Sequence, residues 1–144
     1  MPEQVYVEDV SVGDEIPSLR KSPSPADLVM FAGATGDFSP VSFDLPYARE
    51  AGLEGVIVQG GLKAAYLGQL LHDWAGPAGV IRRFGCQYRG MDYPNQTLVC
   101  RGVVTRIYED GGEALVDLDV WTENASEFRT SPGSATVALP RRGA

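Results

Sequence analysis

The distribution of apolar and polar residues divides this chain into a helical first half and a strand-rich second half. Residues 61–74 are apolar on nearly all sides, which predicts a buried helix. After Gly79 the pattern changes to apolar runs separated by turn residues, which predicts strands over 80–89, 96–108, 113–122 and 127–139. Successive antiparallel strands joined by short turns need no crossover helices. The pattern therefore predicts an α+β fold, with a long curved antiparallel sheet wrapped around the 61–74 helix.

Particular faces of these elements are expected to form the core. On the third predicted strand, Val116, Leu118 and Val120 are expected to face the helix. One face of the helix carries Leu62, Ala65, Tyr66, Gln69, Leu70 and Trp74. A further short strand is expected over residues 4–8.

The first half contains two shorter helical segments with clear end signals. Ser24 is a good N-cap residue, and Asp27 completes a reciprocal cap, so a helix is predicted to begin here. Gly36 ends that helix and is followed by a polar loop. A second short helix is predicted over 46–51, with Asp44 placed to cap it.

Length, charge and composition indicate one ordinary globular domain. The 144 residues fit a single domain, residues 1–144, with a substantial core. The net charge of −7 argues against a general nucleic-acid or anionic-membrane surface. The sequence has neither a signal-peptide pattern nor an apolar run long enough to span a membrane, so we expect a cytoplasmic protein. Five arginines close together in sequence form either a local patch for an anionic ligand or a solvated strand face: Arg82, Arg83, Arg89, Arg101 and Arg106.

The two cysteines, Cys86 and Cys100, make no metal-ligand pattern, and neither a metal nor a redox cofactor is expected. They lie symmetrically about residues 92–94, so a hairpin of 80–91 and 96–108 would place them nearly opposite each other. Because a reducing cytosol disfavours disulfides, two buried, reduced thiols are expected.

The first candidate for chemistry is the loop 36–44, which holds Asp37 and Asp44 close to Phe38 and Phe43. A carboxylate in apolar surroundings can have a raised pKa and act as a base near neutral pH. The alternative is structural: Asp37 ties the loop, and Asp44 caps the following helix.

The second candidate is the entrance to the long helix, Gln59-Gly60-Gly61. A glycine pair before a helix allows close backbone approach and leaves N–H groups free. Those donors can hold a carbonyl oxygen as it gains negative charge. Most glycine pairs are simply turns, so this feature is weak evidence by itself.

The loop and the helix entrance together resemble the signature of MaoC-like hot-dog proteins. The family pattern is Gly-Asp-x-Asn-Pro-x-His-x-Asp, followed later by His-Gly-Met. Its aspartate falls on Asp37, its asparagine on Ser39 and its catalytic histidine on Ser42, while the histidine of the later His-Gly falls on Gln59. The resemblance extends more loosely over most of the chain and implies the hot-dog arrangement of the predicted sheet and helix.

The resemblance also implies a reaction: Asp and His activate water for addition to an α,β-unsaturated acyl thioester, or carry out the reverse elimination. In this chain Asp37 would be the base, with Ser42 and Gln59 as polar positioning residues. The region around Gly60 and Gly61 would hold the thioester. Ser42 can orient water but cannot exchange a proton near neutral pH as imidazole does. The single histidine, His72, lies about 15 Å along the helix from the glycine pair at 1.5 Å per residue, so it is a poor replacement.

Two functions remain open. The chain is either an acyl-thioester hydratase or dehydratase with an atypical site, or a non-catalytic partner subunit that shapes the acyl tunnel. Either would bind an acyl-CoA or acyl-carrier-protein thioester and form a homodimer or a heteromer with a second hot-dog subunit. Aromatic residues suited to an acyl chain are Phe31, Phe38, Phe43 and Tyr66. A hot-dog thioesterase is a third possibility, which the Gly-Asp-x-x-Pro signature disfavours.

Overall fold

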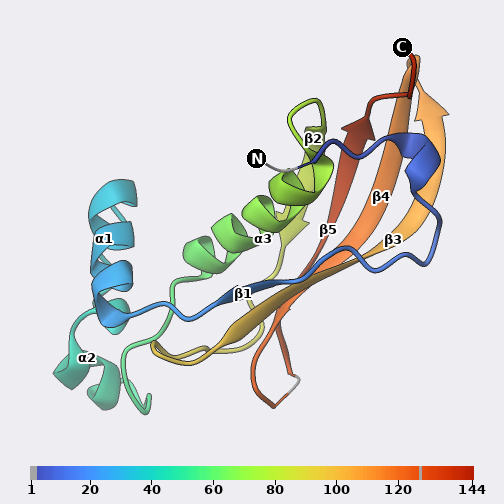
Figure 1. Ribbon diagram of the computed structural model, residues 1–144. Coiled ribbons are helices and arrows are strands. Elements are labelled where there is room, and N and C mark those ends of the chain that lie inside the picture. Colours follow the sequence, from blue (N-terminus) through green and yellow to red (C-terminus); the bar gives the residue numbers. More distant parts are fainter. Residues whose placement is uncertain (1–2, 127) are drawn as a thin grey trace.

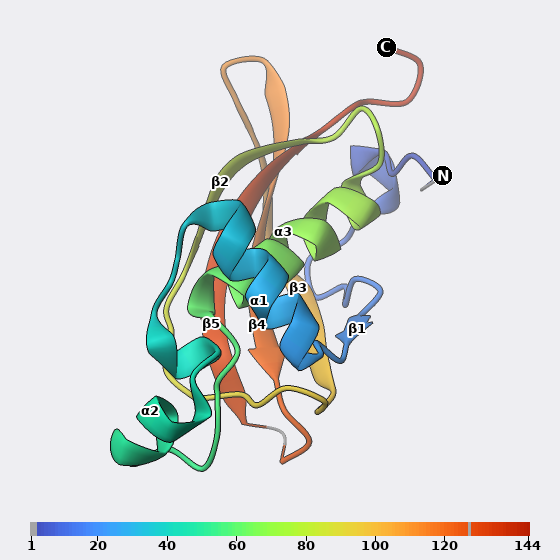
Figure 2. The ribbon, with the colours of Figure 1, turned by 90° about the vertical axis from the view of Figure 1, so that its left-hand side faces the viewer.

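The strands form one curved antiparallel sheet, with the longest helix lying along its concave face (Figures 1 and 2). This computed structural model describes residues 3–126 and 128–144. The sheet order is β1-β3-β4-β5-β2. The strands are β1 (Leu19–Lys21), β2 (Val80–Cys86), β3 (Leu98–Asp110), β4 (Glu113–Glu123) and β5 (Arg129–Leu139). The predicted α+β sheet around one helix is therefore confirmed, although residue 127, the expected start of the last strand, lies outside the described residues.

The pairing of β2 differs from the prediction. β2 pairs with β5 at the far edge of the sheet, whereas the sequence suggested a hairpin with β3. Both edges of β3 are already occupied, because it pairs with β1 on one side and β4 on the other. β2 pairs instead with the edge of β5 that β4 leaves free. Cys86 therefore lies opposite Gly133, while Cys100 lies opposite Leu19 and Thr122, so the expected proximity of the two cysteines was wrong. Both are free thiols.

The tight β3–β4 hairpin keeps its strands in register. Gly111 and Gly112 both have positive φ, +59° and +80°, which is the backbone that two-residue hairpin turns of the primed type require. The register places Val116, Leu118 and Val120 in the core beneath the helix, as predicted.

The long helix α3 (Gly60–Ala75) is buried on one side only. Its buried residues are Lys63, Leu67, Leu70, Leu71 and Ala75, of which the four apolar ones pack against the sheet. The opposite side, including Ala65, Gln69 and His72, is exposed. The expectation of a helix buried all round, and of a core face through Ala65 and Gln69, was therefore wrong, because the sheet covers a single side of the helix.

Two smaller helices stand beside one end of the sheet (Figure 1), namely α1 (Pro25–Thr35) and α2 (Leu45–Glu50). The Ser24 hydroxyl accepts the backbone N–H of Asp27, and the Asp27 carboxylate accepts the backbone N–H of Ser24, as predicted. The short 3₁₀ helices are η1 (Val7–Asp9) and η2 (Pro40–Ser42).

The strand expected over residues 4–8 does not form, because Gln4 binds the end of α3. Its amide donates to the Ala75 oxygen at 2.8 Å and accepts the Ala78 N–H at 2.7 Å. Within the described residues, no helix combines the length and apolar character needed to cross a membrane.

Candidate functional site

The loop that follows α1 carries Asp37 at the surface. Gly36 ends the helix in the left-handed conformation, with φ +74°, and its N–H donates to the Ala32 oxygen at 2.9 Å. The Asp37 carboxylate is exposed and accepts the Ser39 N–H at 3.3 Å. This hydrogen bond is the loop-tying role that the sequence left open as an alternative.

The aromatic residues of this loop do not enclose the carboxylate within a single chain. Phe38 is 63% exposed and Phe43 is 44% exposed. The apolar surroundings expected for Asp37 are therefore open to solvent on this chain alone. Any closing of the loop would have to come from a ligand or another subunit.

The other two polar residues of the loop have different surroundings. Ser42 is only 3% exposed, in the short helix η2. Asp44 accepts the Tyr47 N–H at 3.1 Å and caps α2, so the capping interpretation of Asp44 is confirmed.

The entrance to α3 is more enclosed than the loop. The Gln59 side chain is 4% exposed, and its amide nitrogen donates to the Leu28 oxygen at 2.8 Å. Its amide oxygen is buried and has no partner among the described residues. Gln59 therefore ties α1 to the start of α3, while one buried acceptor is left over at that point.

Two aromatic rings bound the glycine pair. A Cβ on Gly60 would lie 2.7–2.8 Å from three ring carbons of Tyr88, and a Cβ on Gly61 would lie 3.1 Å from Phe31 Cζ. Contacts below 3.0 Å do not occur for real Cβ atoms, so the Tyr88 ring as placed requires glycine at position 60. The first N–H groups of a helix have no partner within the helix, and these two rings frame them.

A buried ion pair lies just inside this entrance. Lys63 Nζ lies 3.1 Å from Asp92 Oδ2 and donates to the Gly90 oxygen at 2.9 Å. Both side chains are 2% exposed. The sequence patterns predicted no functional role for Lys63 or Asp92. The available signal was a lysine one helical turn before the buried Leu67, within an otherwise apolar segment.

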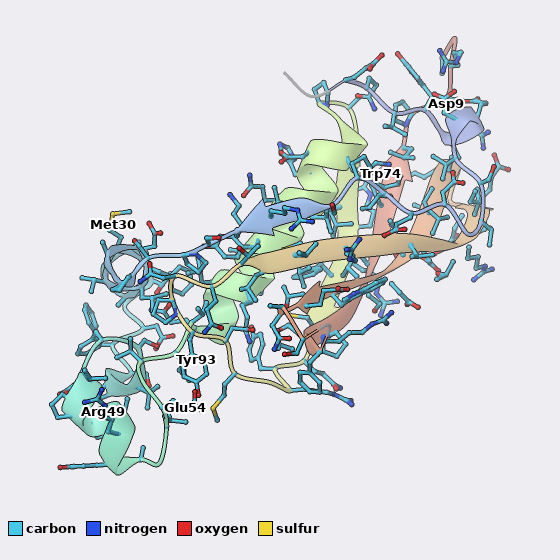
Figure 3. All side chains as sticks on the ribbon, turned by 60° about the horizontal axis from the view of Figure 1, so that its bottom comes forward. Asp9, Met30, Arg49, Glu54, Trp74 and Tyr93 are labelled. Carbon is cyan, nitrogen blue, oxygen red and sulfur yellow. The ribbon has the colours of Figure 1, made fainter. Side chains whose placement is uncertain are left out.

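An apolar groove adjoins the glycine pair between α1 and α3. It has a volume of about 470 Å³, and its apolar lining includes Met30, Phe31, Leu62 and Tyr66. The Lys21 ammonium lies 5.3 Å from the centroid of the Tyr66 ring. Met30, labelled in Figure 3, is 66% exposed and therefore lies at the open rim of this groove. The structure thus brings Phe31 and Tyr66 together, while Phe38 and Phe43 remain on the exposed loop.

Burial raises the pKa of several groups near this region. For Cys86 the main cause is burial, opposed by a hydrogen bond with Tyr88 and by the charge of Lys63. Burial is also the main cause of the raised pKa of Tyr88 and of Tyr66. These thiol and phenol groups are therefore held in their neutral forms.

The five arginines do not form one patch. Arg82 and Arg83 lie on β2, whereas Arg101 and Arg106 lie on β3, with β4 and β5 between them. Arg101 also pairs with Glu15 and with Glu123, each at 3.1 Å. Of the two alternatives, a single basic patch is therefore excluded, since the sheet order separates the arginines of β2 from those of β3. Within residues 3–126 and 128–144, no three His, Cys, Asp or Glu side chains gather as a metal site.

A curved antiparallel half-barrel around a helix, with a glycine entrance to that helix, defines a hot-dog domain. The sequence profile described as "MaoC like domain" matches residues 7–124. This chain belongs to that family of hydratases and dehydratases.

Comparisons with individual proteins agree with this assignment. The 3-oxo-4,17-pregnadiene-20-carboxyl-CoA hydratase beta subunit of Mycobacterium tuberculosis is 29% identical over 131 residues, 91% of this chain and 96% of that protein. The ChsH1–ChsH2 complex of M. tuberculosis contains a chain with TM-score 0.79 and 26% identity, covering 90% of this chain and 98% of that one. The (R)-hydratase of A. caviae shares the fold, with TM-score 0.84 at 23% identity over 93% of this chain and all of that one.

One relative is much longer than this chain. The fatty acid synthase beta subunit TOXC of Cochliobolus carbonum is 34% identical over 77 residues, which are 52% of this chain and 4% of that protein.

Proposed function

We propose that this protein is a subunit of an acyl-thioester hydratase or dehydratase, and that its active form includes a second hot-dog subunit. The observation that carries the proposal is the entrance to α3. There, the backbone of Gly60 and Gly61 lies between the rings of Tyr88 and Phe31, beside a buried amide oxygen of Gln59. Helix N–H groups bounded in this way suit a thioester oxygen that gains negative charge.

The acyl chain fits the neighbouring groove. Phe31 borders both Gly61 and the groove of about 470 Å³, so a thioester held at the helix entrance can lay its apolar chain along Met30, Leu62 and Tyr66. Ligand sites are commonly apolar clefts with a few fixed polar groups, and this arrangement has that character.

The acid–base chemistry is the incomplete part of the site. In the family pattern the histidine position is Ser42, which cannot exchange a proton near neutral pH. Asp37 is the remaining candidate base, and it is exposed on a single chain. One general acid or base typically contributes about 10²–10⁴-fold to a rate. We therefore assign the larger part of proton transfer to the second subunit, with Asp37 and Ser42 orienting water or substrate.

The edge strand β2 is a suitable surface for that subunit. It has an unpaired edge and exposes Val80, Ile81 and Phe84 by 43%, 36% and 37%. Edge strands of this kind pair with another chain unless they are covered. The M. tuberculosis relative is named as a beta subunit, and the ChsH1–ChsH2 structure is a complex of two proteins, which supports the proposal of a partner.

A cytoplasmic location is part of the proposal, because Cys86 and Cys100 are free thiols.

A second candidate function is an enzyme that is active as this chain alone or as copies of it, with Asp37 as its only base. The position of Asp37 directly after α1, where the family pattern has its aspartate, favours this candidate. A pure binding subunit has no catalytic need of that carboxylate.

The test is hydration of crotonyl-CoA and of one longer enoyl-CoA, followed by the loss of absorbance of the conjugated thioester. Wild type is compared with Asp37→Asn and with the control Asp44→Asn, which retains the cap of α2 because Asn is an equally good N-cap. We expect little turnover by the purified protein alone. Titration calorimetry should nevertheless show that the protein binds the acyl-CoA thioester tightly. Turnover that disappears only in Asp37→Asn would favour the self-sufficient enzyme, and absence of thioester binding would refute both functions.

A further inference from the structure

The Lys63–Asp92 pair is unusual in both its burial and its place in the helix. Both side chains are 2% exposed, and Lys63 lies in the first turn of α3. A positive charge near a helix N-terminus is disfavoured by the helix dipole. Buried ion pairs are also poor stabilisers, because removing two charges from water offsets their attraction. We therefore look for the role of the pair in the chain segments that it holds together, since its net contribution to stability is small.

The pair joins α3 to the connection between β2 and β3. Lys63 Nζ binds both the Asp92 carboxylate and the Gly90 oxygen, at 3.1 and 2.9 Å. The backbone oxygen of Asp92 also accepts the Val58 N–H at 2.8 Å, just before the helix begins. The segment 87–92 is thus attached at both sides of the first turn of α3.

The same segment is attached to the sheet. The N–H groups of Arg89 and Gly90 donate to the backbone oxygen of Thr130, within β5, at 2.9 and 3.0 Å. Figure 2 shows the chain leaving β2 and passing the first turn of α3 on its way to β3. Between its attachments to β5 and to Lys63, the segment has little freedom to move.

Tyr88 is the residue that this arrangement places on the glycine entrance. Its ring carbons would lie 2.7–2.8 Å from a Cβ at Gly60, so the ring rests on the Gly60 backbone. Tyr88 is nevertheless 59% exposed, which leaves much of the ring accessible to a ligand. A ring in this position bounds the space in front of the helix N–H groups.

We propose that Lys63 and Asp92 are positioning residues, which hold segment 87–92 so that Tyr88 forms a wall of the thioester-oxygen site at Gly60. The identity of the ligand as a thioester rests on the proposed function. The geometric part, in which the pair holds Tyr88 against Gly60, is independent of whether the chain catalyses a reaction.

The geometric part is tested by the amide proton of Gly60 in a ¹⁵N-labelled sample. An aromatic ring on a backbone amide shifts that proton resonance, and Tyr88→Leu identifies the size of the shift. The double variant Lys63→Met/Asp92→Leu removes both charges, so no buried charge is left unpaired. We expect it to move the Gly60 resonance towards its position in Tyr88→Leu. An unchanged Gly60 resonance in a folded double variant would overturn the inference.

The functional part is tested by titration calorimetry with butyryl-CoA, a saturated thioester that cannot be hydrated. We expect the double variant and Tyr88→Leu each to bind about tenfold more weakly than wild type, which corresponds to about 1.4 kcal/mol. The triple variant should be no weaker than either, because the pair acts through Tyr88 and the effects are not additive. The control Arg141→Met/Glu109→Leu removes an exposed ion pair of the same charge types and should bind as wild type does.

The outcomes separate this inference from the proposed function. Wild-type binding that is retained in the double variant refutes the positioning role and leaves the proposed function standing. Absence of binding in wild type refutes the proposed function, while the Gly60 resonance still decides the geometry. If the double variant does not fold, Lys63→Met/Asp92→Asn, which also removes both charges but preserves the shape of the Asp92 side chain, replaces it in both measurements. The same shift and a smaller loss of affinity are then expected, and no change in either would overturn the inference.

Discussion

Gln59 and Leu28 join two helices at the candidate site: the Gln59 amide donates a 2.8 Å hydrogen bond to the backbone oxygen of Leu28. Leu28 lies within α1, and Gln59 directly precedes the first residue of α3. The helix that delivers the Asp37 loop is therefore tied directly to the glycine entrance by this side chain, and Phe31 of the same helix packs against Gly61.

The first prediction concerns the chemistry of that side chain. Gln59→Met removes the hydrogen bond and the unpartnered oxygen together, so we expect a loss of at most about 1 kcal/mol in the free energy of unfolding. Gln59→Glu places a carboxylate against a buried oxygen and should cost about 3 kcal/mol or more at pH 7. Urea unfolding of both variants measures the difference.

The pH dependence of Gln59→Glu gives a sharper test. Burial should raise the pKa of the introduced carboxyl above the ordinary value of about 4.3, and only the protonated form can donate to Leu28. The group then binds more protons in the folded than in the unfolded state, so stability falls as pH rises above about 4.3. The deficit relative to wild type should be smallest below that pH. A deficit independent of pH would contradict burial of this position.

The second prediction compares three glycines of α3. Gly60→Ala forces the Tyr88 ring aside, because its Cβ would lie 2.7 Å from the ring, and butyryl-CoA binding should weaken about tenfold. Gly61→Ala meets Phe31 Cζ at 3.1 Å and should weaken binding less. Gly68→Ala meets nothing within 4 Å and should raise the free energy of unfolding by about 0.5–1 kcal/mol without affecting binding. Equal effects of Gly60→Ala and Gly68→Ala on binding would contradict a site at the helix entrance.

The third prediction concerns the free edge of the sheet. Phe84 lies on β2 and is 37% exposed, so Phe84→Glu adds charge to the proposed subunit interface with little effect on the fold of one chain. In a mixture with the second hot-dog subunit, sedimentation velocity should show Phe84→Glu shifted from the complex towards the free chains. The control Val12→Glu changes a 62% exposed residue outside the strands and should leave the assembly unchanged. The same sedimentation profile for all three proteins would exclude β2 as the contact surface.

The fourth prediction concerns alkaline pH. Burial raises the pKa of the Cys100 thiol from its ordinary value of 9.0 to about 12. Between these values the unfolded chain loses this proton and the folded chain retains it, so stability falls as pH rises from about 9 towards 12. The contribution is at most about 1.4 kcal/mol per pH unit. Cys100→Val should remove this part of the slope in urea unfolding, whereas Cys86→Val should retain it. Identical slopes for wild type and Cys100→Val would show that the thiol ionises in the folded protein.

The sequence by itself determined the features that depend on near neighbours. Ser24 and Asp27 begin α1, Gly36 ends it, and Asp44 caps α2, because each signal is a hydrogen bond or a backbone preference within a few residues. The alternation on β4 likewise assigned Val116, Leu118 and Val120 to the core, since strand periodicity is local.

The tertiary structure decided the features that depend on distant segments. β2 pairs with β5 and not with β3, whose two edges are taken by β1 and β4, and this separates the arginines of β2 from those of β3 and Cys86 from Cys100. The burial of Lys63 depends on Asp92, 29 positions further along the chain, which no local pattern reveals. The exposure of Asp37 likewise depends on what covers its loop. Local signals set where elements begin and end, whereas strand order and buried charge pairs are settled by competition among contacts across the whole domain.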